Sequence, residues 1–181
     1  KLIDQSQGDL LVLAEYALTG SLVLDEGADV HQWAIESAQA EVQLMVPDGK
    51  YLLLNTVAEM DGQLFNCSKL LPTTDYTCKL FPDPIEEKAG IQPGREQKVF
   101  ELFEKRFKVI ICYDLPHMDQ IPTDDLDFLV FVYHFTESNF LRVSEEAQAV
   151  SVSRNLPVLA SSLVSDKNNG HSSYINGNAV V

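Results

Sequence analysis

The most informative stretch of this chain reads Lys108-Val109-Ile110-Ile111-Cys112-Tyr113-Asp114-Leu115-Pro116. A short apolar run ends on a thiol, and an acid and a proline follow closely, which predicts a buried strand that delivers Cys112 to a sharp turn. A strand-to-turn junction of this kind exposes a nucleophile on a fixed backbone. Free cysteine is also one of the most buried residue types, so a core cysteine is the alternative that the local pattern leaves open.

Two further segments deliver an ionisable residue in the same way. The apolar run within residues 9–20 ends at Glu15, and residues 76–82 carry Lys79, with Glu86 a short distance beyond. A carboxylate, an ammonium and a thiol, each at the end of an extended segment, form a set suited to nucleophilic catalysis. Taken singly, Glu15 and Lys79 are also compatible with ordinary solvated charges at strand ends.

With these residues in this order, the chain resembles the carbon–nitrogen hydrolases, also called the nitrilase superfamily, in which a Glu, a Lys and a Cys act together. The family's glutamate stretch, Pro-Glu-Leu-Ala-Leu-Thr-Gly-like, is similar to Ala14-Glu15-Tyr16-Ala17-Leu18-Thr19-Gly20. Its Arg-Lys-Leu-x-Pro stretch is similar to Cys78-Lys79-Leu80-Phe81-Pro82, and its Cys-Tyr-Asp/Glu stretch is similar to Cys112-Tyr113-Asp114.

The resemblance extends over nearly the whole chain. Residues 52–71, with Asn66, are similar to the family's strand and hairpin before the lysine, and Pro93-Gly94 is similar to its turn before the cysteine hairpin. Residues 127–133, 148–158 and 170–177 are similar to its later strands and helix. The chain departs from the family pattern at Ala14, Thr77-Cys78, Val150 and Ser153. The last two replace an Arg and a Glu, which puts interface details in doubt and leaves the three central residues unaffected.

The resemblance implies a thioester mechanism. Glu15 is the expected base, which takes the thiol proton of Cys112, passes it to the leaving nitrogen and then activates water. Lys79 and the backbone N–H of Tyr113 are expected to hold the developing oxyanion. Because Glu15 would lie beside a water-poor pocket, we expect its pKa to be raised.

Further side chains are expected around this set. Glu86 resembles a second family carboxylate that orients the lysine or the substrate, and Glu87 is the alternative if the register differs by one. Tyr133, His134 and Phe135 follow a very apolar strand and are expected, with Tyr113, to line the substrate pocket.

A histidine offers a competing site. A Cys112–His134 pair with an aspartate would follow papain-like logic, which sequence leaves open. His31, His117 and His171 lie in polar or loop contexts, and no histidine or cysteine spacing fits a zinc site, so we predict no metal and no cofactor.

Composition narrows the possible partners and the compartment. The net charge of −14 argues against nucleic acids and anionic membranes, because phosphate binding needs clustered cations. Three cysteines form no obvious framework, which favours a reducing cytoplasmic setting, although a Cys67–Cys78 disulfide stays open. No stretch reaches the ~20 apolar residues of a spanning helix, and no secretory signal opens the chain.

The pattern predicts one α/β domain over residues 1–181, and the resemblance implies a four-layer α-β-β-α sandwich. Relatives are longer, so we expect a fragment, or the ordered part of a longer chain, incomplete at both ends. Expected strands cover residues 10–14, 51–58, 63–70, 98–103, 106–111, 127–133, 157–161 and 172–180. Expected helices cover residues 28–40 and 138–155, the latter capped by Ser138 or Asn139, and residues 83–93 are expected to form an acidic loop near the mouth of the site.

We therefore predict an enzyme that hydrolyses a non-peptide carbon–nitrogen bond in a small-molecule amide, carbamoyl compound or nitrile, with amides favoured. The alternatives are an N-acyltransferase that uses the same three residues, and a binding protein of the same fold without turnover. Self-association as a homodimer or larger homo-oligomer is implied by the resemblance alone.

Overall fold

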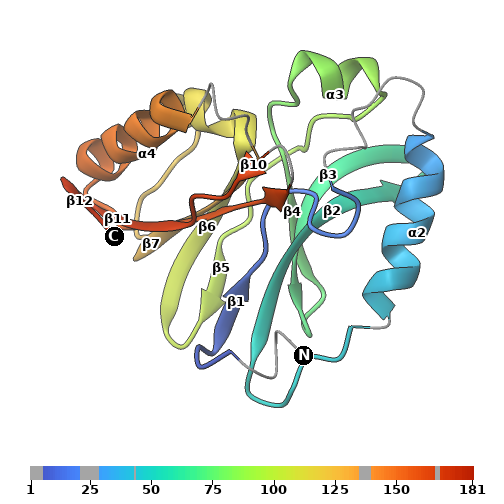
Figure 1. Ribbon diagram of the computed structural model, residues 1–181, viewed down its shortest axis with the longest axis horizontal. Helices are drawn as coiled ribbons and strands as arrows, with labels where there is room; N and C mark the ends of the chain where they lie inside the picture. The colour runs from blue at the N-terminus through green and yellow to red at the C-terminus, as the bar shows by residue number, and fades with distance from the viewer. Residues whose placement is uncertain (1–5, 21–28, 43, 135–139, 166–167) are drawn as a thin grey trace.

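The computed structural model describes residues 6–20, 29–42, 44–134, 140–165 and 168–181. They form two β-sheets packed face to face, with helix α2 on the outer face of one sheet and helix α4 on the outer face of the other (Figure 1). This arrangement is the four-layer α-β-β-α sandwich that the resemblance implied.

The first sheet has the strand order β1-β2-β3-β4. Strand β1 (Leu10–Val12) runs parallel to β2 (Tyr51–Met60), while β3 (Gln63–Leu71) pairs antiparallel with both β2 and β4 (Asp75–Cys78). The β2–β3 turn is Asp61-Gly62, and both residues have positive φ, as the two-residue hairpin predicted from this pair requires.

The second sheet has the order β12-β11-β8-β7-β6-β5. Its centre is parallel: β6 (Lys105–Ile111), β7 (Phe128–Tyr133) and β8 (Val158–Ser162) run in one direction. β5 (Phe100–Leu102), β11 (Ser173–Asn176) and β12 (Ala179–Val180) complete it with antiparallel pairings. A separate short ribbon joins β9 (Val164–Ser165) and β10 (Asn168–Asn169).

Burial on two faces explains why the central strands are apolar throughout. Alternate residues of β6, such as Val109 and Ile111, pack between the sheets with Leu53 of β2, while Ile110 packs toward α4 with Ala147. A strand with apolar neighbours on both sides reads as a continuous hydrophobic run, and such a run directly precedes Cys112.

The helices and the closing strands differ in detail from the predictions. α2 (Val30–Val42) and α4 (Phe140–Arg154) lie close to the predicted ranges, and the proposed caps of α4, Ser138 and Asn139, fall outside the described residues. The single strand predicted over residues 172–180 is wrong, because a turn with positive φ at Gly177 splits it into the β11–β12 hairpin.

The predicted loop at residues 83–93 contains a short helix, α3 (Pro84–Lys88). Asp83 caps it by accepting hydrogen bonds from the backbone N–H groups of Ile85 and Glu86, and Glu86 bonds back to the N–H of Asp83. Asp-Pro-x-Glu is a capping box with proline at the first helical position. The loop predicted over these residues therefore misses the start of α3. None of the described helices is long and apolar enough to cross a membrane.

Candidate active site

The three residues singled out from the sequence lie at strand ends. Glu15 follows β1, Lys79 follows β4, and Cys112 follows β6. Cys112 has a φ of 43°, a left-handed conformation that costs a non-glycine residue roughly 1–3 kcal/mol and is found mostly where a side chain must be presented at a site. After this turn the chain enters the 3-10 segment η2 (Cys112–Gln120), so the thiol stands at a strand-to-helix junction.

The buried ammonium of Lys79 lies between two carboxylates. Its Nζ is 3.2 Å from Glu15 Oε1 and 2.7 Å from Glu86 Oε2, and each of the three side chains is at most 1% exposed. Glu87 is exposed on α3, so Glu86, and not its neighbour, lies in this cluster. Both carboxylates raise the pKa of Lys79 against the opposing effect of burial, which keeps the ammonium charged.

Glu15 has partners on both carboxylate oxygens. Oε1 accepts from Asn66 Nδ2 at 2.9 Å and from Lys79, while Oε2 lies 3.2 Å from the backbone N and from Nδ1 of His134. Burial by itself raises the pKa of Glu15, but Lys79, His134 and Asn66 outweigh it and lower the pKa to about 2. The expectation of a raised pKa is therefore wrong, because it counted the dry pocket and omitted the cations and donors that surround this carboxylate.

The side-chain amide of Asn66 donates to the carboxylates of both Glu15 and Glu86. Its Nδ2 lies 2.9 Å from Glu15 Oε1, 2.8 Å from Glu86 Oε1 and 3.0 Å from the Tyr16 hydroxyl, which itself donates to Glu86. Asn55 Nδ2 donates to Asn66 Oδ1, which fixes the amide orientation. Sequence reasoning noted Asn66 only as part of the resemblance and missed Tyr16 and Asn55. The available signal was an asparagine within each of the two neighbouring strands predicted as a hairpin, since buried polar groups need partners.

The Cys112 sulfur is a thiol at rest. Burial and the negative charge of Glu15 raise the pKa of Cys112 well above its ordinary value, although Lys79 acts in the opposite direction. The Sγ atom lies 3.8 Å from the carbonyl oxygen of His134, whereas the ring of His134 faces Glu15. The geometry thus pairs the histidine ring with the glutamate, which favours a carboxylate base over a direct cysteine–histidine pair.

Asp114, two residues after the cysteine, ties the cysteine turn to the lysine segment. Its Oδ1 accepts from the backbone N–H groups of Leu80 and Phe81, both at 2.9 Å, and its Oδ2 accepts from Gln97 Nε2 at 3.0 Å and from Ile111 N at 3.3 Å. Burial raises the pKa of Asp114 to about 7 against these hydrogen bonds. The sequence pattern assigned no role to Asp114, because its four hydrogen-bond donors come from three separate segments.

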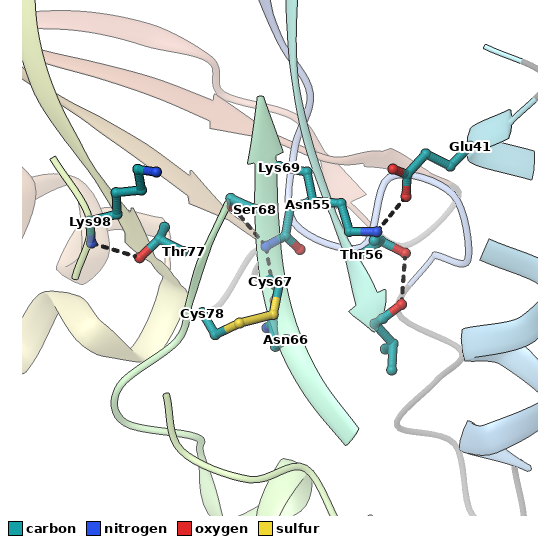
Figure 2. Close-up of a disulfide and its surroundings, with 11 residues drawn as sticks. Glu41, Asn55, Thr56, Asn66, Cys67, Ser68, Lys69, Thr77, Cys78 and Lys98 are labelled. Carbon is teal, nitrogen blue, oxygen red and sulfur yellow. Dashed lines mark hydrogen bonds and ion pairs between the residues drawn. A yellow bond between two sulfur atoms is a disulfide. The ribbon is translucent and has the colours of Figure 1, made fainter. Parts of the chain in front are cut away.

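A disulfide lies one residue away from both Asn66 and Lys79. Cys67 and Cys78 face each other across β3 and β4 and are bonded (Figure 2). The backbone N–H of Lys79 donates to the carbonyl of Asn66 at 2.8 Å. The structure forms the pair that the sequence had left open. Disulfides are typical of oxidising compartments, so this bond does not favour the predicted cytoplasmic location. The location stays a prediction.

The backbone of Gly94 lies against the same junction. Its N–H donates to the Lys79 carbonyl at 2.7 Å, and a Cβ at this position would lie 2.7 Å from the Cys78 carbonyl oxygen. The contact leaves no room for a side chain, which explains the glycine of the Pro93-Gly94 turn.

A small cavity of about 50 Å³ opens beside Cys112. Tyr113, Tyr133 and His134 line it together with Cys112, whereas Phe135 lies outside the described residues. The Tyr133 hydroxyl donates to the carbonyl of His171. Larger hollows of about 310 and 670 Å³ lie over the outer side of β2, β3 and β4, away from the cysteine. We assign the site to the small cavity, because Cys112 lines it together with His134, which contacts Glu15.

Within the described residues, no group of three or more His, Cys, Asp or Glu side chains is arranged to hold a metal ion. The side chains that lie together at this place are a thiol, a carboxylate and an ammonium.

The comparison with solved structures identifies the architecture. A CN-hydrolase superfamily protein from Xanthomonas campestris superposes with a TM-score of 0.72 at 18% identity, over 99% of this chain and 77% of that one. This chain has the carbon–nitrogen hydrolase fold. A carbon–nitrogen hydrolase from Helicobacter pylori gives a TM-score of 0.79 at 13% identity, over 97% of this chain and 72% of that one.

An amidase from Nesterenkonia sp. AN1 also shares the carbon–nitrogen hydrolase fold, with a TM-score of 0.75 at 13% identity over 94% of this chain and 70% of that one. No family model matches the sequence, and no curated protein sequence matches it either. At these identities the likeness concerns the fold, and the chemistry must be argued from the residues of this chain.

Proposed function

We propose that this protein is a thiol-dependent amidase that hydrolyses a non-peptide carbon–nitrogen bond through a Cys112 acyl-enzyme. The observation that carries the proposal is the cluster of Glu15, Lys79 and Cys112 at three separate strand ends. Glu15 and Lys79 are buried and in contact, and both charges act on the partly buried thiol of Cys112. A buried lysine held between two carboxylates has no stabilising advantage over apolar packing, so a chemical role accounts for it better than a structural one.

The first half-reaction would form a thioester. Glu15 takes the proton from the Cys112 Sγ as the sulfur attacks the amide carbonyl carbon, and the resulting oxyanion is stabilised by Lys79 Nζ and the backbone N–H of Tyr113. Glu15 then gives that proton to the nitrogen, the carbon–nitrogen bond breaks, and ammonia or an amine leaves. Glu86 and Asn66 hold Lys79 and Glu15 in place by the contacts described above.

The second half-reaction would consume water. Glu15 takes a proton from a water molecule as the water oxygen attacks the thioester carbonyl carbon, and the carbon–sulfur bond then breaks. The proton returns to the Cys112 sulfur, and the carboxylic acid leaves. Because the resting cysteine is a thiol and Glu15 is ionised, the protonation states at the end match those at the start.

Small aliphatic amides are the substrate class that we favour over nitriles. The cavity beside Cys112 is small, and Tyr133 and His134 restrict it. A glutamate-to-glutamine mutant of the Nesterenkonia amidase, which shares the fold, carries the acetamide moiety of fluoroacetamide covalently at its active-site cysteine. In that adduct the sulfur has displaced fluoride and the amide is intact, so it supports access of a small amide to the cysteine, which we extend to Cys112 as part of the proposal.

The proposal is tested by ammonia release from a panel of acetamide, propionamide, fluoroacetamide, carbamoyl compounds and nitriles. We expect turnover of at least one amide, with a matching acyl adduct on Cys112 in intact mass spectra. Cys112→Ala should abolish both signals, whereas Tyr174→Phe, an exposed change on β11, should leave both unaltered. Amine-dependent formation of a new amide, without free acid, would favour the acyltransferase. The absence of turnover and of adducts across the panel would favour a binding protein.

Self-association as a homodimer or larger homo-oligomer belongs to the same proposal, since it rests on the resemblance alone. Sedimentation equilibrium measures it directly, and a concentration-independent monomer would contradict it.

A further inference from the structure

His134 connects the proposed base and the proposed nucleophile. Its backbone N and its ring Nδ1 both lie 3.2 Å from Glu15 Oε2, and its carbonyl oxygen lies 3.8 Å from Cys112 Sγ. One residue thus contacts two members of the cluster through three different atoms. The mechanism above gives its imidazole no role.

The imidazole is also more exposed than the two charged side chains of this cluster. The side chain of His134 is 21% exposed, while those of Glu15 and Lys79 are 1% exposed. His134 also lines the cavity beside Cys112, so one residue contacts the buried carboxylate and borders the space that a substrate would enter.

We propose that His134 is a positioning residue that acts through Glu15 and decides whether this carboxylate can accept the thiol proton. The proposal rests on the amidase function proposed above and adds a pH-sensitive element to the same site.

The chemistry follows from the two protonation states of imidazole. Neutral imidazole has one N–H, and in the tautomer protonated on Nε2 its Nδ1 can accept a hydrogen bond. When the S–H bond of Cys112 breaks and an O–H bond forms on Glu15 Oε2, that O–H can donate to Nδ1, which stabilises the protonated carboxyl. Imidazolium carries N–H on both nitrogens, so Nδ1 then donates to Oε2 and holds Glu15 in its ionised form.

Charges on every neighbouring element act on this ring. Burial alone lowers the pKa of His134, but the hydrogen bond to Glu15 and the negative charges of Glu15 and Asp83 raise it above its usual value, against the opposing charge of Lys79. The groups that face the ring are Glu15 and Tyr16 after β1, Lys79 after β4, Asp83 at the start of α3, Cys112 after β6, and Arg142 and Glu146 on α4, which line the same cavity. The switch therefore operates at a pH above the usual pKa of histidine, with the base released as pH rises through the raised pKa of His134.

Alkylation of Cys112 by iodoacetamide tests this proposal without a substrate. Cys112 is the free thiol of a chain whose other two cysteines are bonded. The rate is followed by intact mass between pH 5 and 9 in wild type and in His134→Asn, whose amide can keep a donor near the Nδ1 position and does not titrate. The matched control is His31→Asn, because His31 makes the same kind of contact, Nδ1 to Glu59 Oε2 at 3.1 Å, on the exposed face of α2.

We expect the ratio of the His134→Asn rate to the wild-type rate to rise about tenfold as pH falls from about one unit above to about one unit below the histidine pKa. Forming the ratio cancels the thiol's own titration, and the His31→Asn ratio should stay flat. A flat His134→Asn ratio would overturn the proposal. A ratio that falls toward acid would also overturn it, because it would show imidazolium activating the thiolate directly.

A second measurement does not depend on folding of the His134 variant. The pKa of His134, followed by NMR of the imidazole, should fall in Glu15→Gln, and an unchanged value would equally overturn the coupling. Amide turnover is scored separately, so failure of the amidase proposal leaves these two results readable on their own.

Discussion

The most discriminating structural prediction concerns Asp114→Asn. The carboxylate of Asp114 accepts four hydrogen bonds, two on each oxygen. An asparagine of the same shape keeps one acceptor oxygen and places an NH₂ group against the remaining two donors. The oxygen can retain Leu80 and Phe81, so the conflict falls on Gln97 and Ile111.

The geometry also limits the damage. The Oε1 atom of Gln97 is buried without a hydrogen-bond partner among the described residues, so the amide can rotate and accept from the new NH₂ group. One backbone donor, the N–H of Ile111, then stays unsatisfied. Leaving one buried donor unpaired costs about 1–3 kcal/mol, and we expect the free energy of unfolding to fall by this amount.

Chemical denaturation at pH 8 measures this loss, since Asp114, with a pKa of about 7, is ionised there. Asp119→Asn is the matched control, because Asp119 is exposed on the same segment, and its effect should stay within about 0.5 kcal/mol. Equal stability of Asp114→Asn and wild type would refute the account of Asp114 as the residue that joins the cysteine turn to the lysine segment.

Three further predictions follow from the buried charges and the disulfide. Lys79→Met should reduce amide turnover roughly 100- to 1000-fold, because the oxyanion loses a donor. It should also destabilise the fold by about 3–5 kcal/mol, because Glu15 and Glu86 lose their shared cation. Turnover close to that of wild type would contradict the oxyanion role. Replacing Cys67 and Cys78 together by alanine should lower the free energy of unfolding by about 2–4 kcal/mol, measured by chemical denaturation. Reduction of the wild-type protein should raise its intact mass by about 2 Da. An unchanged mass would show that the bond is absent. Because the pKa of Glu15 is lowered, its contribution to stability is present above pH 4.5 and is lost as pH falls toward about 2. The free energy of unfolding should therefore fall less steeply between pH 4.5 and about 2 in Glu15→Gln than in wild type. An equal pH dependence in the two proteins would rule out a lowered pKa.

Much of the fold could be read from local pattern. Continuous apolar runs predicted the central strands, because strands buried on both faces need apolar residues at every position. The Asp61-Gly62 pair predicted the first hairpin, because two positive φ angles are required there. The order of Glu15, Lys79 and Cys112 at the ends of extended segments supplied the candidate site.

The surroundings of these residues could not be read in the same way. Contacts between segments far apart in the chain place Asn66, His134 and Asp114. His134 and Glu15, for example, are separated by 119 positions in the sequence. A sequence gives no distance between such segments. The capping box of α3 was a local signal that was present and not used.

The sequence by itself determined which side chains stand at the strand ends, because hydrophobic periodicity and turn chemistry act within a few residues of the chain. Only the tertiary structure decided their protonation. The pKa of Glu15 is lowered, and not raised as its burial suggested, because Lys79, His134 and Asn66 converge on it from three other strands. Electrostatic interactions act through space and grow as water is excluded, so the charge state of this site is a property of the packed sheets and not of any one segment.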